Sequence, residues 1–262
     1  MITIQKYVRA KSLEEAWQLN QLKRNRILGG MLWLRLGKGT VGTAIDLCDL
    51  GLDKIEETED AFSIGATVTL RALETHAGLN AYTNHAAADS VKDIVGVQFR
   101  NMATVGGSIW GRFGFSDVLT LFLALDSYVE LYKGGIVPLE QFCRMKPDND
   151  ILVRLIVKKT PCRIVYSAMR IQKTDFPVIT CAVSQLGGEY RAAVGARPAR
   201  AEVFRDEKGL LGGGITEEGA NAFAAYVAEC AKTGSNLRGS AAYRSRLIRT
   251  LTARSLLQLG GN

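Results

Sequence analysis

Residues 98–108 read QFRNMATVGGS, and residues 26–36 read RILGGMLWLRL. Each stretch joins an apolar segment to a Gly-Gly pair, and a turn without Cβ atoms lets the backbone approach a ligand closely. Successive backbone N–H groups in such a turn can point into one concavity and bind phosphate. A diphosphate needs several donors, so we expect the two glycine turns to converge on it. The hydroxyls of Thr104 and Ser108 flank the second pair and add donors.

Glycine pairs by themselves are a weak signal in this chain. Adjacent glycines also begin at 134, 187, 212, 213 and 260, where we interpret them as plain turns. Neither of the two stretches is a GxGxxG fingerprint, and the chain has no P-loop. A Rossmann oxidoreductase and a P-loop NTPase are therefore disfavoured.

The composition is that of a globular protein. The chain has 262 residues, of which 47% are hydrophobic and 23% charged, enough for one large or two modest domains. The N-terminus lacks the apolar core of a signal peptide, and the longest apolar stretch, around 118–125, is too short to cross a bilayer. We therefore expect a soluble, cytoplasmic protein that does not bind membranes.

Metal chemistry within this chain is not expected. The five cysteines are scattered without a CxxC pair, and there are only two histidines, which disfavours zinc and iron–sulfur sites. Any redox chemistry then needs an organic cofactor. The net charge of +7 is spread along the chain without a nucleic-acid-binding motif. It suits an anionic cofactor or acidic partners better than nucleic acid.

Periodicity indicates two units of different character. A strand over 2–8, a helix over 12–24 and a short strand over 26–28 predict an α/β opening unit. After residue 161, segments 164–170, 178–183 and 190–195 predict an antiparallel meander. Two amphipathic helices, over 216–232 and 240–259, follow it. The pattern predicts a mixed α/β domain followed by a smaller α+β domain, divided near 160–165.

Several segments together resemble a known family. The stretch 98–108 is similar to QIRNxATIGGN, and LGGML at 28–32 stands where the family has AGGTD. Asp117 occupies the position of the Asp in a SPAAD-like segment. Segments 62–74, 169–184, 194–201 and 243–256 follow the family in order. The chain is identified on these residues as a member of the FAD-binding (medium) subunits of the xanthine dehydrogenase / carbon monoxide dehydrogenase family of molybdenum hydroxylases.

The resemblance implies an α+β fold. A two-subdomain FAD-binding domain of the vanillyl-alcohol-oxidase (PCMH) type would cover residues 1–162, with subdomains at about 1–58 and 59–162. A smaller α+β domain like the C-terminal domain of CO dehydrogenase flavoproteins would cover 163–262.

The resemblance also implies a site for non-covalent FAD. Asp117 would bind a polar part of FAD and Leu152 would pack near the flavin ring, while Arg170, or alternatively Lys173, would approach from the C-terminal domain. The residues implied around the diphosphate are Ile27, Leu28, Gly29, Gly30, Met31, Leu32, Trp33 and Leu34 on one side, and Thr104, Val105, Gly106, Gly107 and Ser108 on the other.

The chain departs from the family pattern at several of these positions. Met31 and Leu32 replace Thr-Asp, and Ser108 replaces Asn. Removing one hydrogen bond to a buried ligand costs about 1–3 kcal/mol. Trp110 and Phe113 are bulky where the family often has small residues. Because both glycine pairs and Asp117 remain, we expect FAD still to bind.

The implied function is electron transfer in an oxidoreductase complex, with no catalytic acid or base in this chain. Partner subunits would hold molybdopterin and 2Fe-2S clusters, and electrons would pass through FAD to an acceptor such as NAD. Three alternatives stay open: a degenerate or assembly subunit without active flavin, a flavin reductase of cell-wall synthesis, and a polyanion binder suggested by charge alone.

Overall fold

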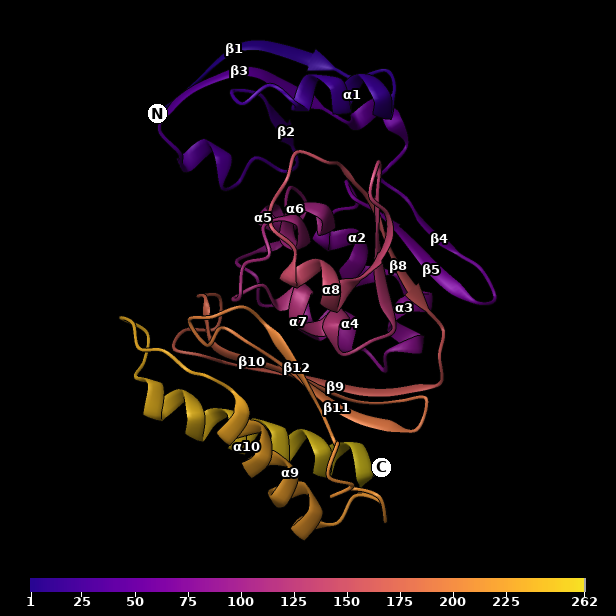
Figure 1. Ribbon diagram of the computed structural model, residues 1–262, viewed down its shortest axis with the longest axis vertical. Helices are drawn as coiled ribbons and strands as arrows, with labels where there is room; N and C mark the ends of the chain where they lie inside the picture. The colour runs from indigo at the N-terminus through magenta and orange to yellow at the C-terminus, as the bar shows by residue number, and fades with distance from the viewer. Residues whose placement is uncertain (262) are drawn as a thin grey trace.

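Three β-sheets follow one another along the chain, from top to bottom in Figure 1. The computed structural model describes residues 1–261, so residue 262, the last of the expected C-terminal domain, lies outside the described residues. The first sheet has the order β1-β3-β2, and both of its strand pairs are parallel. Its elements are β1 (Ile2–Arg9), α1 (Leu13–Asn20), β2 (Arg26–Leu28) and β3 (Gly39–Asp46).

Helix α1 begins at an N-cap, as the sequence predicts, but ends earlier than expected. The Oγ of Ser12 accepts a hydrogen bond of 3.1 Å from the backbone N–H of Glu15, and the Glu15 carboxylate accepts one from the backbone N–H of Lys11, which together resemble a capping box. The helix stops at Asn20 rather than at 24. The amide of Asn25 donates to the carbonyl of Leu19 and holds the chain in a turn there.

The second sheet is antiparallel, with the order β4-β5-β8-β6-β7. Its strands are β4 (Ile55–Glu57), β5 (Ala61–Gly65), β6 (Ser127–Leu131), β7 (Gly135–Pro138) and β8 (Leu152–Lys158). Strand β4 lies before the subdomain boundary expected at 58, yet it pairs with β5. That boundary therefore falls inside a hairpin, and by sheet membership the second subdomain begins before β4.

Short helices occupy most of the chain between β5 and β8 in the sequence. Two short 3-10 helices, η1 (Leu34–Leu36) and η2 (Cys48–Leu50), flank β3 in the first subdomain. The helices of the second subdomain are α2 (Leu70–Thr75), α3 (Ala77–Tyr82), α4 (Ala86–Val91), α5 (Val97–Arg100), α6 (Val105–Trp110), α7 (Asp117–Leu123) and α8 (Leu139–Arg144).

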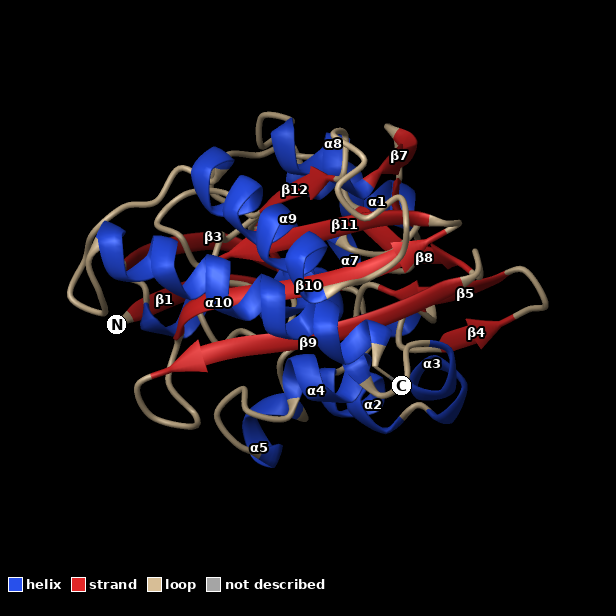
Figure 2. Ribbon diagram, turned by 90° about the horizontal axis from the view of Figure 1, so that it is seen from below, coloured by secondary structure: helices blue, strands red, loops and turns tan. Residues whose placement is uncertain are grey.

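The third sheet is the antiparallel meander expected from the sequence, in the order β12-β11-β10-β9. Its strands are β9 (Cys162–Arg170), β10 (Pro177–Leu186), β11 (Glu189–Gly195) and β12 (Glu202–Arg205). Helices α9 (Glu217–Cys230) and α10 (Ala241–Gly260) lie across one face of it (Figure 2).

The third sheet is covered on both faces. Strand β10 is buried at nearly every position, as expected of a strand with two covered faces. On one face Ile179 and Val183 pack with Ile248 and Leu256 of α10. On the other face Ala182 joins the main core, to which α4 and α7 also contribute. The C-terminal domain therefore shares a continuous apolar core with the second subdomain.

Candidate functional site

The two glycine turns lie against each other. A Cβ atom at Gly29 would stand 2.9 Å from the Oγ1 of Thr104, and one at Gly107 would stand 3.0 Å from the same atom. A Cβ atom at Gly30 would overlap the carbonyl oxygen of Met102 at 1.8 Å. The absence of side chains at these positions is thus what allows the loop after β2 to contact the segment before α6.

The backbone donors of the second turn are used differently from our expectation. Thr104 is the N-cap of α6, and its Oγ1 accepts a hydrogen bond of 3.1 Å from the N–H of Gly107. The N–H groups of Val105 and Gly106 donate to the carbonyls of the segment after β5. The prediction that this turn offers free N–H groups to a diphosphate is therefore wrong at these residues, because the turn is the first turn of a helix packed on that segment.

A pocket of about 700 Å³ opens where the glycine turns meet, between the first and second subdomains. We call it the glycine-turn pocket. Its size is within the usual range of ligand pockets, about 300–1,000 Å³. Its apolar wall comes from β2 and the start of β8, and its polar rim from the turn after α1 and from residues 148–150. Of the residues implied by the resemblance, it is lined by Ile27, Leu28, Gly29, Thr104, Gly106, Gly107 and Leu152.

The chemistry of this pocket fits the nucleotide part of FAD. Thr67 is one of its lining residues, and the Oγ1 of Thr67 is buried without a hydrogen-bond partner among the described residues. Such an orphaned hydroxyl is costly unless a ligand satisfies it. Lys23 and Arg26 bring positive charge to one part of the rim, where it suits a diphosphate, and Asp148 and Asp150 bring negative charge to another. Ile27 and Leu152 offer apolar surface for a flat ring.

The residues after the first glycine pair lie outside this pocket. Met31 has a left-handed backbone with φ of 58°. Leu32 is buried in the main core, so the position where the family has a carboxylate is occupied by an apolar side chain that faces inward. Leu34 packs against the β1-β3-β2 sheet. Neither Val105, which is buried in the core, nor Ser108, whose hydroxyl donates to the carbonyl of Thr104, lines the pocket.

Four aromatic side chains from three parts of the chain pack together. Trp33 lies 5.7–6.1 Å, between ring centroids, from each of Phe113, Phe115 and Phe176. Phe113 and Phe115 are stacked at 5.2 Å. We call these four residues the aromatic cluster. Trp33 is 51% exposed and Phe113 43% exposed, so the cluster presents a large apolar face to solvent at the junction of both subdomains with the C-terminal domain.

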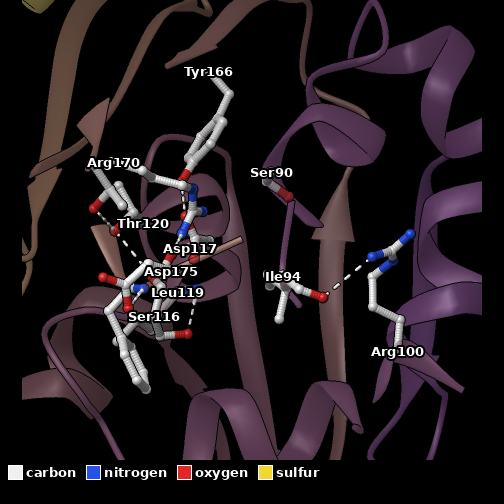
Figure 3. Close-up of polar contacts among 12 residues, drawn as sticks. Ser90, Ile94, Arg100, Ser116, Asp117, Leu119, Thr120, Tyr166, Arg170 and Asp175 are labelled. Carbon is white, nitrogen blue, oxygen red and sulfur yellow. Dashed lines mark hydrogen bonds and ion pairs between the residues drawn. The ribbon is translucent and has the colours of Figure 1, made fainter. Parts of the chain in front are cut away.

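Asp117 and Arg170 form a buried ion pair (Figure 3). The Oδ1 of Asp117 accepts 2.5 Å bonds from the Nη2 of Arg170 and from the hydroxyl of Tyr166. Burial raises the pKa of the Asp117 carboxyl to about 6, against the opposing attraction of Arg170. The other alternative, Lys173, is 83% exposed and lies 4.0 Å from Asp93. Arg170 is therefore the cation that reaches Asp117.

Sequence reasoning missed Tyr166 and Thr67. Tyr166 is one of the buried positions that alternate with less buried ones along β9, a pattern that identifies a core strand without indicating a hydrogen bond to Asp117. Thr67 lies within segment 62–74, which resembles the family, so a signal for it is present in the sequence.

Two classes of feature are absent from the described residues. In residues 1–261, no group of three or more His, Cys, Asp or Glu side chains could hold a metal ion. No helix within the same residues combines the length and hydropathy needed to cross a membrane.

Comparison with known proteins places these features in a family. Residues 2–159 match the FAD binding domain in molybdopterin dehydrogenase, and residues 164–259 match the CO dehydrogenase flavoprotein C-terminal domain. Among curated proteins, the chain is 26% identical to uncharacterized protein YgfM of Escherichia coli K12 over 260 residues, which covers 95% of this chain and 94% of that protein.

Solved structures share the fold. Quinoline 2-oxidoreductase from Pseudomonas putida 86 superposes with a TM-score of 0.85 at 22% identity, covering 98% of this chain and 96% of that one. Reconstituted CO dehydrogenase from Oligotropha carboxidovorans gives 0.86 at 22% identity, covering 99% and 98%. The family's cofactor is FAD. The chain therefore belongs to the family of FAD-binding domains of molybdopterin dehydrogenases, and it carries the C-terminal domain of the CO dehydrogenase flavoproteins.

Proposed function

We propose that this chain is the FAD-binding electron-transfer subunit of a molybdenum hydroxylase complex. The observation that carries the proposal is the glycine-turn pocket, in which two converging turns meet beside Thr67, with its hydroxyl unpartnered in residues 1–261, and the cations Lys23 and Arg26. When bound, FAD supplies one- and two-electron redox chemistry at its ring system. The protein's part is to bind the cofactor and to keep its ring accessible to a donor and an acceptor.

We propose that the implied residues hold FAD as follows. Leu28, Gly29, Thr104, Gly106 and Gly107 surround the nucleotide part. The polar groups of the nucleotide part are bound by Lys23, Arg26 and the hydroxyl of Thr67, because the N–H groups of Val105 and Gly106 are already bonded within the protein. Asp117 and Arg170 act together as one buried pair beside the aromatic cluster, and we propose that this end of the site holds the polar edge of the flavin.

The complex we propose has three kinds of subunit. Partner chains hold the molybdopterin and the 2Fe-2S clusters, and NAD or another acceptor takes the electrons in the cytoplasm. We also propose that the complex resembles xanthine dehydrogenase in its electron acceptor. We propose the domain limits 1–162 and 163–262, with the division inside the first domain placed before β4.

The test is reconstitution with FAD followed by spectroscopy. Purified full-length protein is incubated with FAD, freed of excess by gel filtration and scanned in the visible range. We expect a flavin spectrum with close to one FAD per chain. We also expect that protein co-expressed with its partner subunits shows bleaching of the flavin band by NADH. Protein that leaves the column without flavin absorbance contradicts the proposal.

One specific observation favours a second candidate, a degenerate or assembly subunit that keeps the fold without active flavin. Leu32 buries an apolar side chain where the family has a carboxylate, so one polar contact to FAD is absent from the site. Reconstitution separates the two functions. A subunit of the second kind remains colourless with FAD, yet still assembles with its partners in co-purification.

A further inference from the structure

A second pocket, of about 280 Å³, lies where the C-terminal domain meets the loop between α6 and α7. Phe115 and Phe176 of the aromatic cluster form part of its wall, and Arg238 and Arg244 form another part. We call it the arginine pocket. No residue that lines it lines the glycine-turn pocket, so the two pockets are separate.

Arg244 carries a buried positive charge into this wall. Its side chain is among the most completely buried in the protein, at 1% exposure. Its guanidinium donates to the carbonyls of Val178, Gly234 and Gly239 and to the Oδ1 of Asn236, at 2.6–3.1 Å. All four acceptors are neutral. No carboxylate of residues 1–261 lies within ion-pair distance of it.

Several other buried arginines of this chain have carboxylate partners. Arg197, which is also almost fully buried, pairs with Glu202, and Arg170 pairs with Asp117. A buried charge without a partner is costly. Among the buried arginines of residues 1–261, Arg112 and Arg244 lack a carboxylate within ion-pair distance, and Arg244 is the one that lines the arginine pocket.

Arg238 adds a second cation to the same pocket. It lies over the ring of Phe176, at 4.9 Å from the centroid, and its Nη2 pairs with Asp175 at 3.3 Å. Its Nε is buried and has no hydrogen-bond partner among the described residues. Burial, together with the nearby charge of Arg238, lowers the pKa of Arg244. Of the two guanidinium groups, only that of Arg238 has a carboxylate partner in the described part of the chain.

The remainder of the wall is mostly apolar. It includes Pro177, Pro198 and the rings of Phe115 and Phe176, which meet edge to face at an interplanar angle of 80°. An apolar cavity of about 150 Å³ is large enough for benzene, so the arginine pocket has room for one aromatic ring and a charged substituent.

We propose that the arginine pocket binds a small anion with a planar apolar body, an aromatic or heteroaromatic carboxylate or phosphate ester. The anionic group faces Arg238 and Arg244 and supplies the missing counter-charge, while the ring lies among Phe115, Phe176 and Pro198. This site adjoins the proposed flavin end through Phe115 and Phe176 of the aromatic cluster, but none of its residues lines the pocket assigned to the nucleotide part of FAD.

The test is a calorimetric titration of the full-length protein with benzoate and with phenyl phosphate, using benzamide as the neutral analogue of the same shape. We expect at least one of the two anions to bind with a stoichiometry near one, and benzamide to bind at least tenfold more weakly. Arg238→Gln should weaken the binding of that anion at least tenfold. Arg246→Gln, at an exposed position on α10, removes the same charge away from the pocket and should leave the affinity unchanged.

Three results would overturn the proposal: no binding of either anion, equal binding of benzamide and benzoate, or equal effects of the two arginine substitutions. Because Arg238 is partly exposed, its variant should fold, and circular dichroism with a melting curve establishes that it does. Flavin reconstitution of the same samples keeps the two proposals distinguishable, since Arg238→Gln should retain FAD.

Discussion

Asp117 and Arg170 depend on each other at the scale of single residues. Both side chains are nearly inaccessible to water, and removing one partner of such a pair leaves an uncompensated buried charge, at a cost of about 3–5 kcal/mol. We expect Arg170→Gln to lower the free energy of unfolding by that amount at pH 8. Arg163→Gln, on the exposed side of the same strand, should change it by less than about 0.5 kcal/mol.

The pH dependence of this loss follows from the pKa of Asp117. Below pH 6 the carboxyl is protonated in the folded wild type, whose pKa is about 6, and it is also protonated in the variant, so the two proteins differ least. Above pH 6 the wild type ionises into the ion pair, whereas the variant, without the cation, holds a carboxyl with a still higher pKa. Denaturant titrations at pH 5 and pH 8 should show the loss growing with pH. A loss that is constant with pH would contradict this account.

Substitution of Thr67 should have opposite effects on the stability of the protein without FAD and on its affinity for FAD. Its Oγ1 has no partner in the described residues, so Thr67→Val removes an unsatisfied hydroxyl, and we expect the protein without FAD to gain up to about 1–3 kcal/mol. FAD titration of the variant should show weaker binding, because a polar partner is removed. Thr250→Val, at an exposed position on α10, is the control that should change neither.

How much of the site could be predicted differs from residue to residue. The resemblance singles out Asp117 and Arg170 separately, but their pairing needs the third sheet to pack against α7, and no local pattern reports that. For a related reason, the sequence does not predict that the N–H groups at the start of α6 are hydrogen-bonded within the protein. A Gly-Gly sequence allows close approach without telling whether a ligand or the protein's own backbone makes it.

At the scale of elements, the contact between the two glycine turns is the most constrained. A Cβ atom at Gly30 would stand 1.8 Å from a backbone oxygen that cannot rotate away. We expect Gly30→Ala to cost about 1–3 kcal/mol of unfolding free energy and to weaken FAD binding by separating the turns. Gly213→Ala is the matched control, because its Cβ atom would meet nothing within 4 Å. Thermal melts and flavin titrations of both variants check this, and equal effects would contradict it.

The elements that sequence patterns predict best are those with a strong period or cap. The meander β9–β11 and helices α9 and α10 lie close to the expected ranges. The sequence around helix α6 predicts only an apolar segment followed by a turn, because the two glycines interrupt the helical pattern. Thr104 provides the signal, because its hydroxyl caps the helix. Strand β4 is only three residues long, too short for alternation to be visible.

For the whole molecule, a ligand that binds only the folded state stabilises it by mass action. At a free FAD concentration about one hundred times its Kd, the added stability is about 2.7 kcal/mol. We expect the melting temperature to rise with FAD concentration across the entire transition, since the first and second subdomains both line the pocket. Riboflavin, which lacks the diphosphate and adenosine, should give a smaller shift. Equal shifts would contradict the assignment of the pocket to the nucleotide part.

The aromatic cluster is also completed in a fixed order as the chain is synthesised. Trp33, Phe113 and Phe115 leave the ribosome well before Phe176, and Asp117 leaves before Arg170, because synthesis runs from the N-terminus. A nascent chain that has not yet reached β10 therefore displays three uncovered rings above an acid that lacks its cation. Until the C-terminal domain has been synthesised, these exposed rings are a target for chaperones that bind apolar surface on incompletely folded chains.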